Sequence, residues 1–336
     1  MSSLLTKTMK AIRLHAPGGP RQLVFEDVAV PSVKSNEVLV QNEVIGVNFI
    51  DTYHRTGLYK LELPATLGRE AAGKVVAVGD ALKSQLKVGD RVTYFSPASY
   101  AQFTAVPESS VFCLPPTVDY ESAAAYTLQG LTAHYLVRST FKLESKHTCL
   151  IQAGAGGLGQ ALIQMAKIIG AKVITTVSTP EKEALVRSLG ADHVINYKDL
   201  PEFSSKVREL TGGKGVDVVY DGVGASTWFQ SLKSLRTLGC LCLVGNASGP
   251  VPAIDPLLLS ANGSLFITRP TLVDYLREPG EMQQRCTEIF QWIADGKLTL
   301  SSKTVLPLDS ASQAHEILES RQSAGKILLQ PPALTN

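Results

Sequence analysis

The sequence lacks the features expected of a membrane protein, a secreted protein or a nucleic-acid-binding protein. No apolar run reaches the roughly 20 residues needed to span a bilayer. The N-terminus has no apolar segment long enough for a secretory signal. It is basic and carries no acid before Glu26, which leaves an organelle-import signal open beside a short extension before the first strand. The net charge is +2 with both signs dispersed, so no basic cluster resembles a nucleic-acid footprint.

Cysteine is also scarce, and its number is odd. The five cysteines lie mostly in apolar, strand-like runs. This usage indicates reduced core residues of an intracellular, cytoplasmic protein and argues against a disulfide framework. Cys240 and Cys242 are two apart, so a strand would direct both thiols to the same face. Metal binding there would need two further ligands, and none is near in the sequence, so core packing is the favoured interpretation.

Length and hydropathy favour a folded protein of two domains. The chain has 336 residues, of which 44% are hydrophobic, enough for a large core. From residue 10 to about 130, short strand-like runs alternate with turn signals, which indicates a β-rich, barrel-like domain. From about 148 to 268, strands and helices alternate, which indicates a doubly wound parallel sheet. The helix expected after the fourth of these strands covers Ser226–Leu238. The segment after Pro270 is expected to return to the first domain.

One motif in the alternating region points to a ligand. An apolar run from Thr148 leads into Gly154-Ala-Gly156-Gly-Leu-Gly159, and a helical pattern and a second strand-like run, Lys172–Val177, follow. In a strand–turn–helix unit these glycines permit a tight turn, close approach of a pyrophosphate and close packing of the helix. The first N–H groups of the helix and its dipole then hold the phosphates. The motif predicts a dinucleotide site, although a glycine-rich turn that only packs a helix remains an alternative.

The end of the second strand distinguishes the two nicotinamide dinucleotides. NAD-binding units usually place an acid there, whereas this strand ends Val177-Ser178-Thr179. Lys182 lies one turn into the next helix, where its ammonium can meet a 2′-phosphate, and Tyr197 follows the third strand. Glu181 is an acid near this position and argues against NADPH, but an acid at the start of a helix also complements the helix dipole. We therefore expect NADPH; a solvated surface role for Lys182 is the competing interpretation.

Several blocks outside these strands occur in a fixed order along the chain. They are Gly46-Val-Asn48-Phe-Ile-Asp51-Thr-Tyr53, Gly57-Leu-Tyr59, Gly68-Arg-Glu-Ala-Ala-Gly73, Gln129-Gly-Leu-Thr-Ala, Val244-Gly-Asn-Ala-Ser-Gly249, Thr268-Arg-Pro270 and His315-Glu-Ile-Leu-Glu-Ser-Arg321. Together they resemble the zinc-free quinone oxidoreductases, of the ζ-crystallin type, in the medium-chain dehydrogenase/reductase superfamily. The resemblance covers nearly the whole chain. It implies a GroES-like catalytic domain over 1–130 and 271–336, and a Rossmann NADPH-binding domain over 131–270.

The same resemblance argues against a metal. Zinc alcohol dehydrogenases of the superfamily carry cysteine where this chain has Asn48, and Gly-His-Glu where it has Gly68-Arg69-Glu70. An amide and a cation are not normal Zn²⁺ ligands, and the four-cysteine lobe is absent, so we expect no metal. Without a Lewis acid an alkoxide is poorly stabilised. A quinone spreads the developing charge over a π system, so hydrogen-bond donors suffice.

The resemblance also implies roles for individual residues. Asn48, Tyr53 and Tyr59 are the candidate catalytic residues, although the tyrosines could equally be packing residues. The residues expected to contact the cofactor are Phe49, Ile50, Asp51, Thr52, Tyr53, Thr132, Tyr135, Gly157, Leu158, Ser178, Lys182, Tyr197, Gly222, Val244, Gly245, Asn246, Ala247, Arg269, Pro270, Thr271 and Arg321. Relatives can carry serine at the position of Gly222, so a side-chain hydrogen bond at that position is in doubt. For Arg269 and Arg321, structural ion pairs with nearby acids are the alternative to cofactor contact.

These observations predict an enzyme that transfers reducing equivalents from NADPH to a quinone in a cleft between its domains. One alternative is reduction of a 2-alkenal or enone on the same scaffold. Another is a crystallin-like, NADPH-binding structural protein or a protein that binds AU-rich RNA. The charge pattern gives no support for RNA binding. Pairing of the apolar edge strand Ser264–Thr268 with its copy would hide a sheet edge, so we also expect a homodimer.

Overall fold

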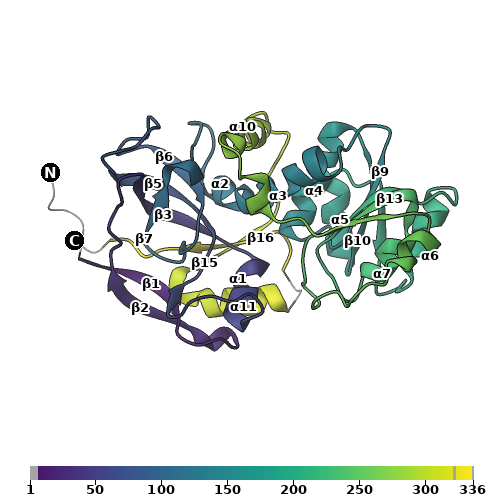
Figure 1. Ribbon diagram of the computed structural model, residues 1–336, viewed down its shortest axis with the longest axis horizontal. Coiled ribbons are helices and arrows are strands. Elements are labelled where there is room, and N and C mark those ends of the chain that lie inside the picture. The colour runs from purple at the N-terminus through teal and green to yellow at the C-terminus, as the bar shows by residue number, and fades with distance from the viewer. Residues whose placement is uncertain (1–6, 321–322, 335–336) are drawn as a thin grey trace. The chain divides into compact units, whose positions relative to one another are not determined.

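The structure is a computed structural model that describes residues 7–320 and 323–334. The chain divides into two compact units, one drawn from residues 1–128 and 279–336 and the other from residues 129–278. The division expected at 130/131 lies two residues from the first of these, and the division expected at 270/271 lies eight residues from the second. In Figure 1 the yellow C-terminal strands β15 (Lys303–Pro307) and β16 (Lys326–Gln330) lie among the purple and blue strands of the first unit.

The first unit is built mainly from antiparallel strands. Its larger sheet has the order β15-β16-β3-β5-β6-β8, with β7 also paired to β3, and its smaller sheet has the order β2-β1-β4. The strands are β1 (Thr8–Leu14), β2 (Leu23–Ala29), β3 (Glu37–Val47), β4 (Ala65–Thr66), β5 (Glu70–Val78), β6 (Arg91–Phe95), β7 (Phe103–Pro107), β8 (Val111–Cys113), β15 (Lys303–Pro307) and β16 (Lys326–Gln330). The helices are α1 (Phe49–Thr56), α2 (Tyr120–Tyr126), α10 (Glu281–Ala294) and α11 (Ala311–Glu319).

The strand register of this unit sets up its buried polar centre. Gly46 near the end of β3 pairs with Glu70 of β5 on one side and with Leu328 of β16 on the other. A Cβ atom on Gly46 would lie 2.2 Å from Glu70 Oε1. Glycine at this position therefore leaves the space that the Glu70 carboxylate occupies between β3 and β5.

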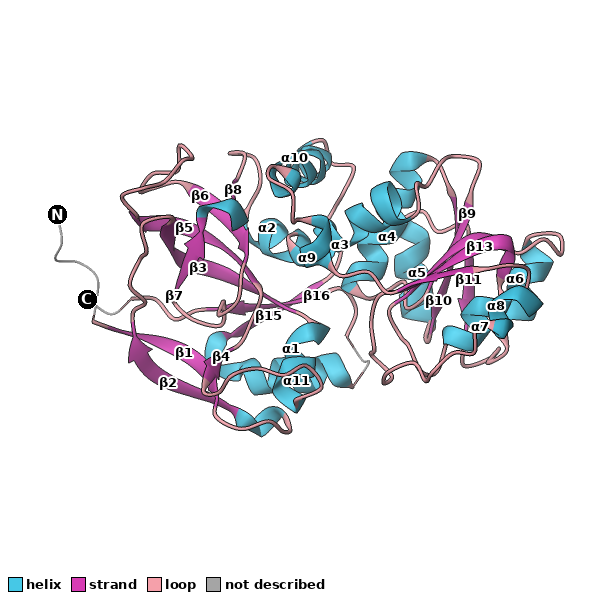
Figure 2. Cartoon of the chain, viewed as in Figure 1, coloured by secondary structure: helices cyan, strands magenta, loops and turns pink. Residues whose placement is uncertain are grey.

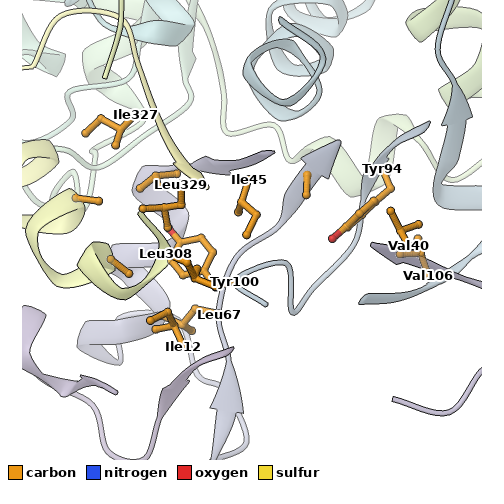
Figure 3. Close-up of a cluster of buried hydrophobic side chains, with 14 of the residues drawn as sticks. Ile12, Val40, Ile45, Leu67, Tyr94, Tyr100, Val106, Leu308, Ile327 and Leu329 are labelled. Atoms are coloured by element: carbon orange, nitrogen blue, oxygen red, sulfur yellow. The ribbon is translucent and has the colours of Figure 1, made fainter. Parts of the chain in front are cut away.

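An apolar cluster from both ends of the chain fills the first unit (Figure 3). Ile12, Ile45 and Leu329 are at most 1% exposed. Fully burying a side chain of this size stabilises a fold by roughly 1.5–3 kcal/mol. Tyr94 and Tyr100 are fully buried in the same cluster, and each turns its hydroxyl to a polar partner. The cluster therefore fixes two tyrosine hydroxyls as well as the strands.

The second unit is a six-stranded parallel sheet with the order β11-β10-β9-β12-β13-β14. This is the Rossmann strand order, in which the direction of winding reverses beside the first strand. The strands are β9 (Thr148–Ile151), β10 (Lys172–Val177), β11 (His193–Asn196), β12 (Val216–Asp221), β13 (Leu235–Leu243) and β14 (Phe266–Thr268). The helices are α4 (Gly157–Ile169), α5 (Pro180–Ser188), α6 (Phe203–Leu210), α7 (Trp228–Lys233), α8 (Leu257–Ala261) and α9 (Leu272–Tyr275), and α3 (Leu128–Tyr135) leads into the unit.

Helices cover both faces of this sheet. Figure 2 shows α4 and α5 on one face and α6, α7 and α8 on the other. Phe203 of α6 and Leu232 of α7 pack in one cluster with strand residues such as Leu150 and Leu241. Both faces are thus buried, which explains the nearly continuous apolar runs of the strands. Among the described residues, no helix combines the length and the hydrophobicity needed to cross a bilayer.

The helix expected at Ser226–Leu238 is much shorter in the structure. It ends at Lys233, and β13 already begins at Leu235. Leu235 pairs with Val216, but Cys240 is the next β13 residue in register, opposite Val218. Leu238, with a φ of 60°, lies in the irregular stretch between them. A bulge of this kind disrupts period-two alternation, so the sequence pattern resembled a longer helix.

Candidate active site

The glycine-rich turn joins β9 to α4. A Cβ atom on Gly154 would lie 2.0 Å from Thr175 Oγ1, and one on Gly159 would lie 2.5 Å from the Ala153 carbonyl oxygen. These two glycines therefore let the turn pack against β10 and let α4 lie against the turn. The N-cap residue of α4 is Gly156, which has no side chain to cap the helix, and Gly157 and Leu158 in the first turn are half-buried. N–H groups in a first helical turn are suitable donors to phosphate oxygens.

Basic and hydroxyl groups surround the end of β10. The Tyr197 N–H donates to the Val177 carbonyl at 3.1 Å, which places Tyr197 beside the last residue of this strand. Thr179 caps α5 by accepting from the Lys182 N–H at 3.3 Å. The pKa of Lys182 is lowered, first by burial and then by the nearby charge of Lys198. Lys198, which was not selected from the sequence, therefore lies close enough to Lys182 for the two charges to repel each other.

Ser178 and Glu181 occupy the same edge of the sheet. Ser178 directly follows β10 and is half-buried, whereas Glu181 is exposed in the first turn of α5. Backbone N–H donation and a hydrogen bond from Thr179 lower the pKa of Glu181. Glu181 therefore complements the start of its helix, as its position in the sequence allowed.

A second loop crosses the ends of β12 and β13. The Val244 N–H donates to the Asp221 carbonyl at 2.8 Å, and the Ala247 N–H donates to the Gly222 carbonyl at 3.3 Å. A Cβ atom on Gly245 would lie 2.4 Å from the Gly222 oxygen, so these two backbones touch. A Cβ atom on Gly222 itself would meet Val244 Cγ2 at 3.8 Å, which is ordinary contact. The predicted segment Val244–Ala247 is thus held by its backbone against the turn after β12.

Arg269 fastens this loop. Its Nη1 donates to the Leu243 carbonyl at 3.0 Å. In the amide orientation that satisfies both ends of the Asn246 side chain, its nitrogen donates to the Gly245 carbonyl at 3.0 Å and its oxygen accepts from Arg269 Nη2 at 3.3 Å. Pro270 is buried and Thr271 is exposed. The guanidinium therefore positions residues that were predicted to contact the cofactor.

Two further predicted contacts lie in α3. Thr132 is half-buried, and Tyr135 is 2% exposed. The Tyr135 ring stacks on Tyr275, with ring centroids 4.1 Å apart and planes inclined by 7°. Burial raises the pKa of Tyr135. Since Tyr275 covers one face of its ring, Tyr135 also has a packing role within this unit.

In the first unit, α1 carries an aromatic cluster. The rings of Phe49 and Tyr53 are 6.3 Å apart, those of Tyr53 and Tyr59 are 5.3 Å apart, and those of His54 and Tyr59 are 5.9 Å apart. The structure therefore brings together the two candidate tyrosines. Arg69 Nη2 lies 2.9 Å from His54 Nε2, and burial followed by the Arg69 charge lowers the pKa of His54.

The remaining predicted residues of α1 anchor its start. Phe49 and Ile50 are half-buried, while Asp51 and Thr52 are buried. Thr52 Oγ1 donates to the Phe49 carbonyl at 2.8 Å. Asn48 and Asp51 form a capping box at the first turn, with the Asn48 N–H donating to Asp51 Oδ2 at 2.9 Å. The Asp51 side chain thus interacts with its own unit.

Asn48 takes part in a buried ionic cluster. Its Nδ2 donates to Glu70 Oε1 at 2.7 Å, and its Oδ1 accepts from Lys326 Nζ at 2.9 Å. Lys326 Nζ also lies 2.6 Å from Glu70 Oε1, and Glu70 Oε2 accepts from the Leu128 N–H. The Lys326 and Glu70 side chains are 1% and 0% exposed. Both ends of the Asn48 amide are therefore engaged by charged groups of the first unit.

Comparison with known proteins identifies the relatives of this chain. A family model for an alcohol dehydrogenase GroES-like domain matches residues 34–140, and one for a zinc-binding dehydrogenase matches residues 157–294. Quinone oxidoreductase 1 of Escherichia coli is 41% identical over 325 residues, covering 95% of this chain and 99% of the relative. The chain belongs to the quinone oxidoreductases of the medium-chain dehydrogenase/reductase superfamily.

Solved structures of this family have the same fold. The Escherichia coli quinone oxidoreductase complexed with NADPH matches with a TM-score of 0.93 at 40% identity, covering 96% of this chain and 100% of that chain. A mycobacterial protein complexed with NADPH matches with a TM-score of 0.94 at 44% identity and the same coverage. A 2-haloacrylate reductase from a Burkholderia species is 40% identical over 331 residues, covering 95% of this chain and 98% of the relative. The expected superfamily and the Rossmann and GroES-like architecture are therefore confirmed.

Several buried polar residues of the first unit could not be recognised as site residues from the sequence pattern that was used. Glu70 and Lys326 were not selected, although each is a charged residue at the start of an apolar strand run. That pattern is a usable signal, because lysine and glutamate are seldom fully buried unless paired. Tyr100 and His315 were also overlooked. Arg321 lies outside the described residues, and its predicted role remains a prediction.

Metal binding has no candidate site in the part of the chain that the structure describes. No group of three or more His, Cys, Asp or Glu side chains in residues 7–320 and 323–334 is arranged to hold an ion. Cys240 Sγ and Cys242 Sγ lie 3.8 Å apart on one face of β13, as the sequence predicted, without a third ligand among these residues.

Proposed function

We propose that this protein is an NADPH-dependent quinone reductase that works without zinc. The observation that carries the proposal is the end of β10 beside the β9–α4 glycine turn, where Ser178 stands in place of the usual acid and Lys182 lies close by. It occurs in a chain whose full-length relatives are quinone oxidoreductases. Solved structures at 40% and 44% identity contain NADPH, which supports the same cofactor here.

The residues of the second unit fit this cofactor. The close backbone approaches at Gly159 and Gly245 leave no room for side chains at these two turns. The first turn of α4, with Gly157 and Leu158, would hold the pyrophosphate. Ser178, Lys182 and Tyr197, joined by Lys198, would surround the 2′-phosphate. When bound, NADPH supplies the reducing equivalents; the protein binds and orients it.

The residues of the first unit suit an acceptor that spreads its charge. Tyr53 and Tyr59 form an edge-to-face pair, and their phenol groups can donate to an acceptor oxygen or pack against a flat ring. Donors aimed at a developing oxyanion can lower the barrier without a Lewis acid. Asn48 would position these residues and not contact the acceptor, because Glu70 and Lys326 hold both ends of its amide.

The Glu70–Lys326 pair supports independence from zinc. The Lys326 ammonium already binds the Glu70 carboxylate and the Asn48 amide oxygen, so one fixed positive charge occupies this polar centre. Arg69, where zinc-dependent relatives were expected to carry histidine, contacts His54. A divalent cation would have to displace an ammonium within a site that lacks soft ligands.

We further propose a homodimer formed through β14. This strand lies at one edge of the parallel sheet, and its Phe266 is 61% exposed. Pairing with a second copy would cover the apolar edge and satisfy its backbone groups. The described cysteines are free thiols, which supports the cytoplasmic location that we also propose.

Substrate-dependent oxidation of NADPH tests the proposed function. Initial rates with NADPH or NADH are measured against 1,4-benzoquinone and against a 2-alkenal, an arm included because a 2-haloacrylate reductase is among the relatives. We expect turnover of the quinone with NADPH and much slower reactions for the other three combinations. A preference for the 2-alkenal would assign the protein to the alternative activity.

A further inference from the structure

Asp51 is a buried residue in the first turn of α1, the helix that carries Phe49 and Tyr53 of the aromatic cluster. Its Oδ2 accepts from the Asn48 N–H and from the Tyr100 hydroxyl, both at 2.9 Å. The side chain is 1% exposed. This carboxylate therefore joins the first turn of the helix that carries Phe49 and Tyr53 to the interior of the unit.

A directed chain of hydrogen bonds ends at Asp51. Arg55 donates from Nη2 to Glu319 at 2.7 Å and lies with Nη1 3.1 Å from His315 Nδ1. A guanidinium only donates, so His315 Nδ1 accepts, and Nε2 of the neutral imidazole carries the hydrogen. Burial and the Arg55 charge lower the pKa of His315 to about 3, so the ring is neutral. Nε2 then donates to the Tyr100 oxygen at 3.1 Å, which leaves the hydroxyl hydrogen for Asp51.

The surroundings of Asp51 oppose its charge overall. Tyr100, which contacts Asp51, lies in the apolar cluster shown in Figure 3. Burial of Asp51 is the largest influence on its pKa and raises it. The Lys326 ammonium on β16 favours the charged form, and the Glu70 carboxylate on β5 disfavours it. Asp51 Oδ1 is buried without a hydrogen-bond partner among the described residues. Together these effects raise the pKa of Asp51 from 3.8 to about 7.

We propose that Asp51 is a positioning residue whose charged form holds the first turn of α1, and with it Phe49 and Tyr53, in the arrangement needed for quinone reduction. The charged carboxylate binds the Asn48 N–H and complements the positive end of the helix dipole. Protonation weakens both interactions. The inference deepens the proposed function and rests on it.

The direction of the pH dependence follows from the raised pKa. The charged form is lost as the pH falls through about 7, so kcat should fall on the acid side of that value. His54 and Arg55 are further titratable or charged residues of the same helix, and Arg69 contacts His54. The pKa of His54 is lowered from 6.5, so its titration lies on the acid side of the Asp51 transition.

Steady-state quinone reduction between pH 5.5 and 9 tests the inference. We expect wild-type kcat to show an inflection near pH 7. Tyr100→Phe removes a donor to the charged carboxylate and should move this inflection upward by roughly one pH unit. Asp51→Asn should give a flat profile over the range, and the KM for NADPH should change little in either variant.

A matched control separates positioning from general damage to the core. Tyr94→Phe removes a hydroxyl of the same apolar cluster that bonds Asn42 and Thr104. It should lower the melting temperature as Tyr100→Phe does and leave the inflection in place. An active wild type whose profile coincides with those of Tyr100→Phe and Asp51→Asn would overturn the inference. Absence of quinone reduction by wild type would instead refute the proposed function.

Discussion

The buried Glu70–Lys326 pair makes a strong prediction about stability. Replacing Lys326 by methionine keeps most of the side-chain volume and removes the ammonium. The Glu70 carboxylate, at 0% exposure, then loses the cation that pairs with it, and Asn48 Oδ1 loses its donor at 2.9 Å. Breaking one partner of a buried ion pair costs about 3–5 kcal/mol, so we expect the free energy of unfolding to fall by that amount.

A double variant shows whether the loss of stability comes from the unpaired charge or from altered packing. In Glu70→Gln with Lys326→Met, no unpaired charge remains, and the new amide can still accept from Asn48 or from the Leu128 N–H. Replacement of both partners is often close to neutral, so we expect the double variant to recover most of the lost stability. Lys297→Met removes an exposed ammonium 3.1 Å from Asp295 and should cost less than about 1 kcal/mol.

Urea-induced unfolding followed by tryptophan fluorescence measures these differences within one unit. The chain has two tryptophans, Trp292 in the first unit and Trp228 in the second. A Trp228→Phe background therefore makes the fluorescence report on the unit that contains the ion pair. A Lys326→Met variant within 1 kcal/mol of this background would refute the buried pair. A double variant as unstable as the single variant would assign the loss to packing rather than charge.

Three further predictions concern the second unit. Lys182→Ala should weaken NADPH binding about tenfold and leave NADH binding nearly unchanged, as measured by cofactor fluorescence; equal losses would contradict its phosphate role. Gly245→Ala should destabilise this unit by about 1–3 kcal/mol because the new methyl group meets backbone at 2.4 Å, whereas Gly222→Ala, with a nearest contact at 3.8 Å, should cost less. Urea unfolding in a Trp292→Phe background, where the fluorescence reports on Trp228, compares the two variants, and similar losses would contradict the geometry. Phe266→Asp should give a monomer by light scattering, and an unchanged dimer would exclude the β14 interface.

The features that could be read from the sequence are those set by short stretches of chain. The turn from Gly154 to Gly159 and the strand end at Ser178 are local, since each lies within one strand–turn–helix unit. The alternation of strands and helices was therefore sufficient to predict the Rossmann sheet. The bulge at Leu238 lay beyond this reasoning, because an irregular stretch disrupts the period on which the assignment depends.

The polar centre of the first unit could not be predicted in this way. Glu70 and Lys326 are separated by 256 positions, and Arg55 and His315 by 260. Only the pairing of β16 with β3, and of β3 with β5, brings Lys326 and Glu70 together. The sequence indicated that Asn48 replaces a zinc ligand, but not that an ammonium and a carboxylate engage both ends of its amide.

We propose that the chain reduces quinones with NADPH and without a metal. The most direct test is the rate of NADPH oxidation by 1,4-benzoquinone in protein dialysed against a zinc chelator, with metal content measured by mass spectrometry on the same sample. We expect full activity with far less than one zinc per chain. Activity that disappears with the metal and returns on adding Zn²⁺ would contradict it.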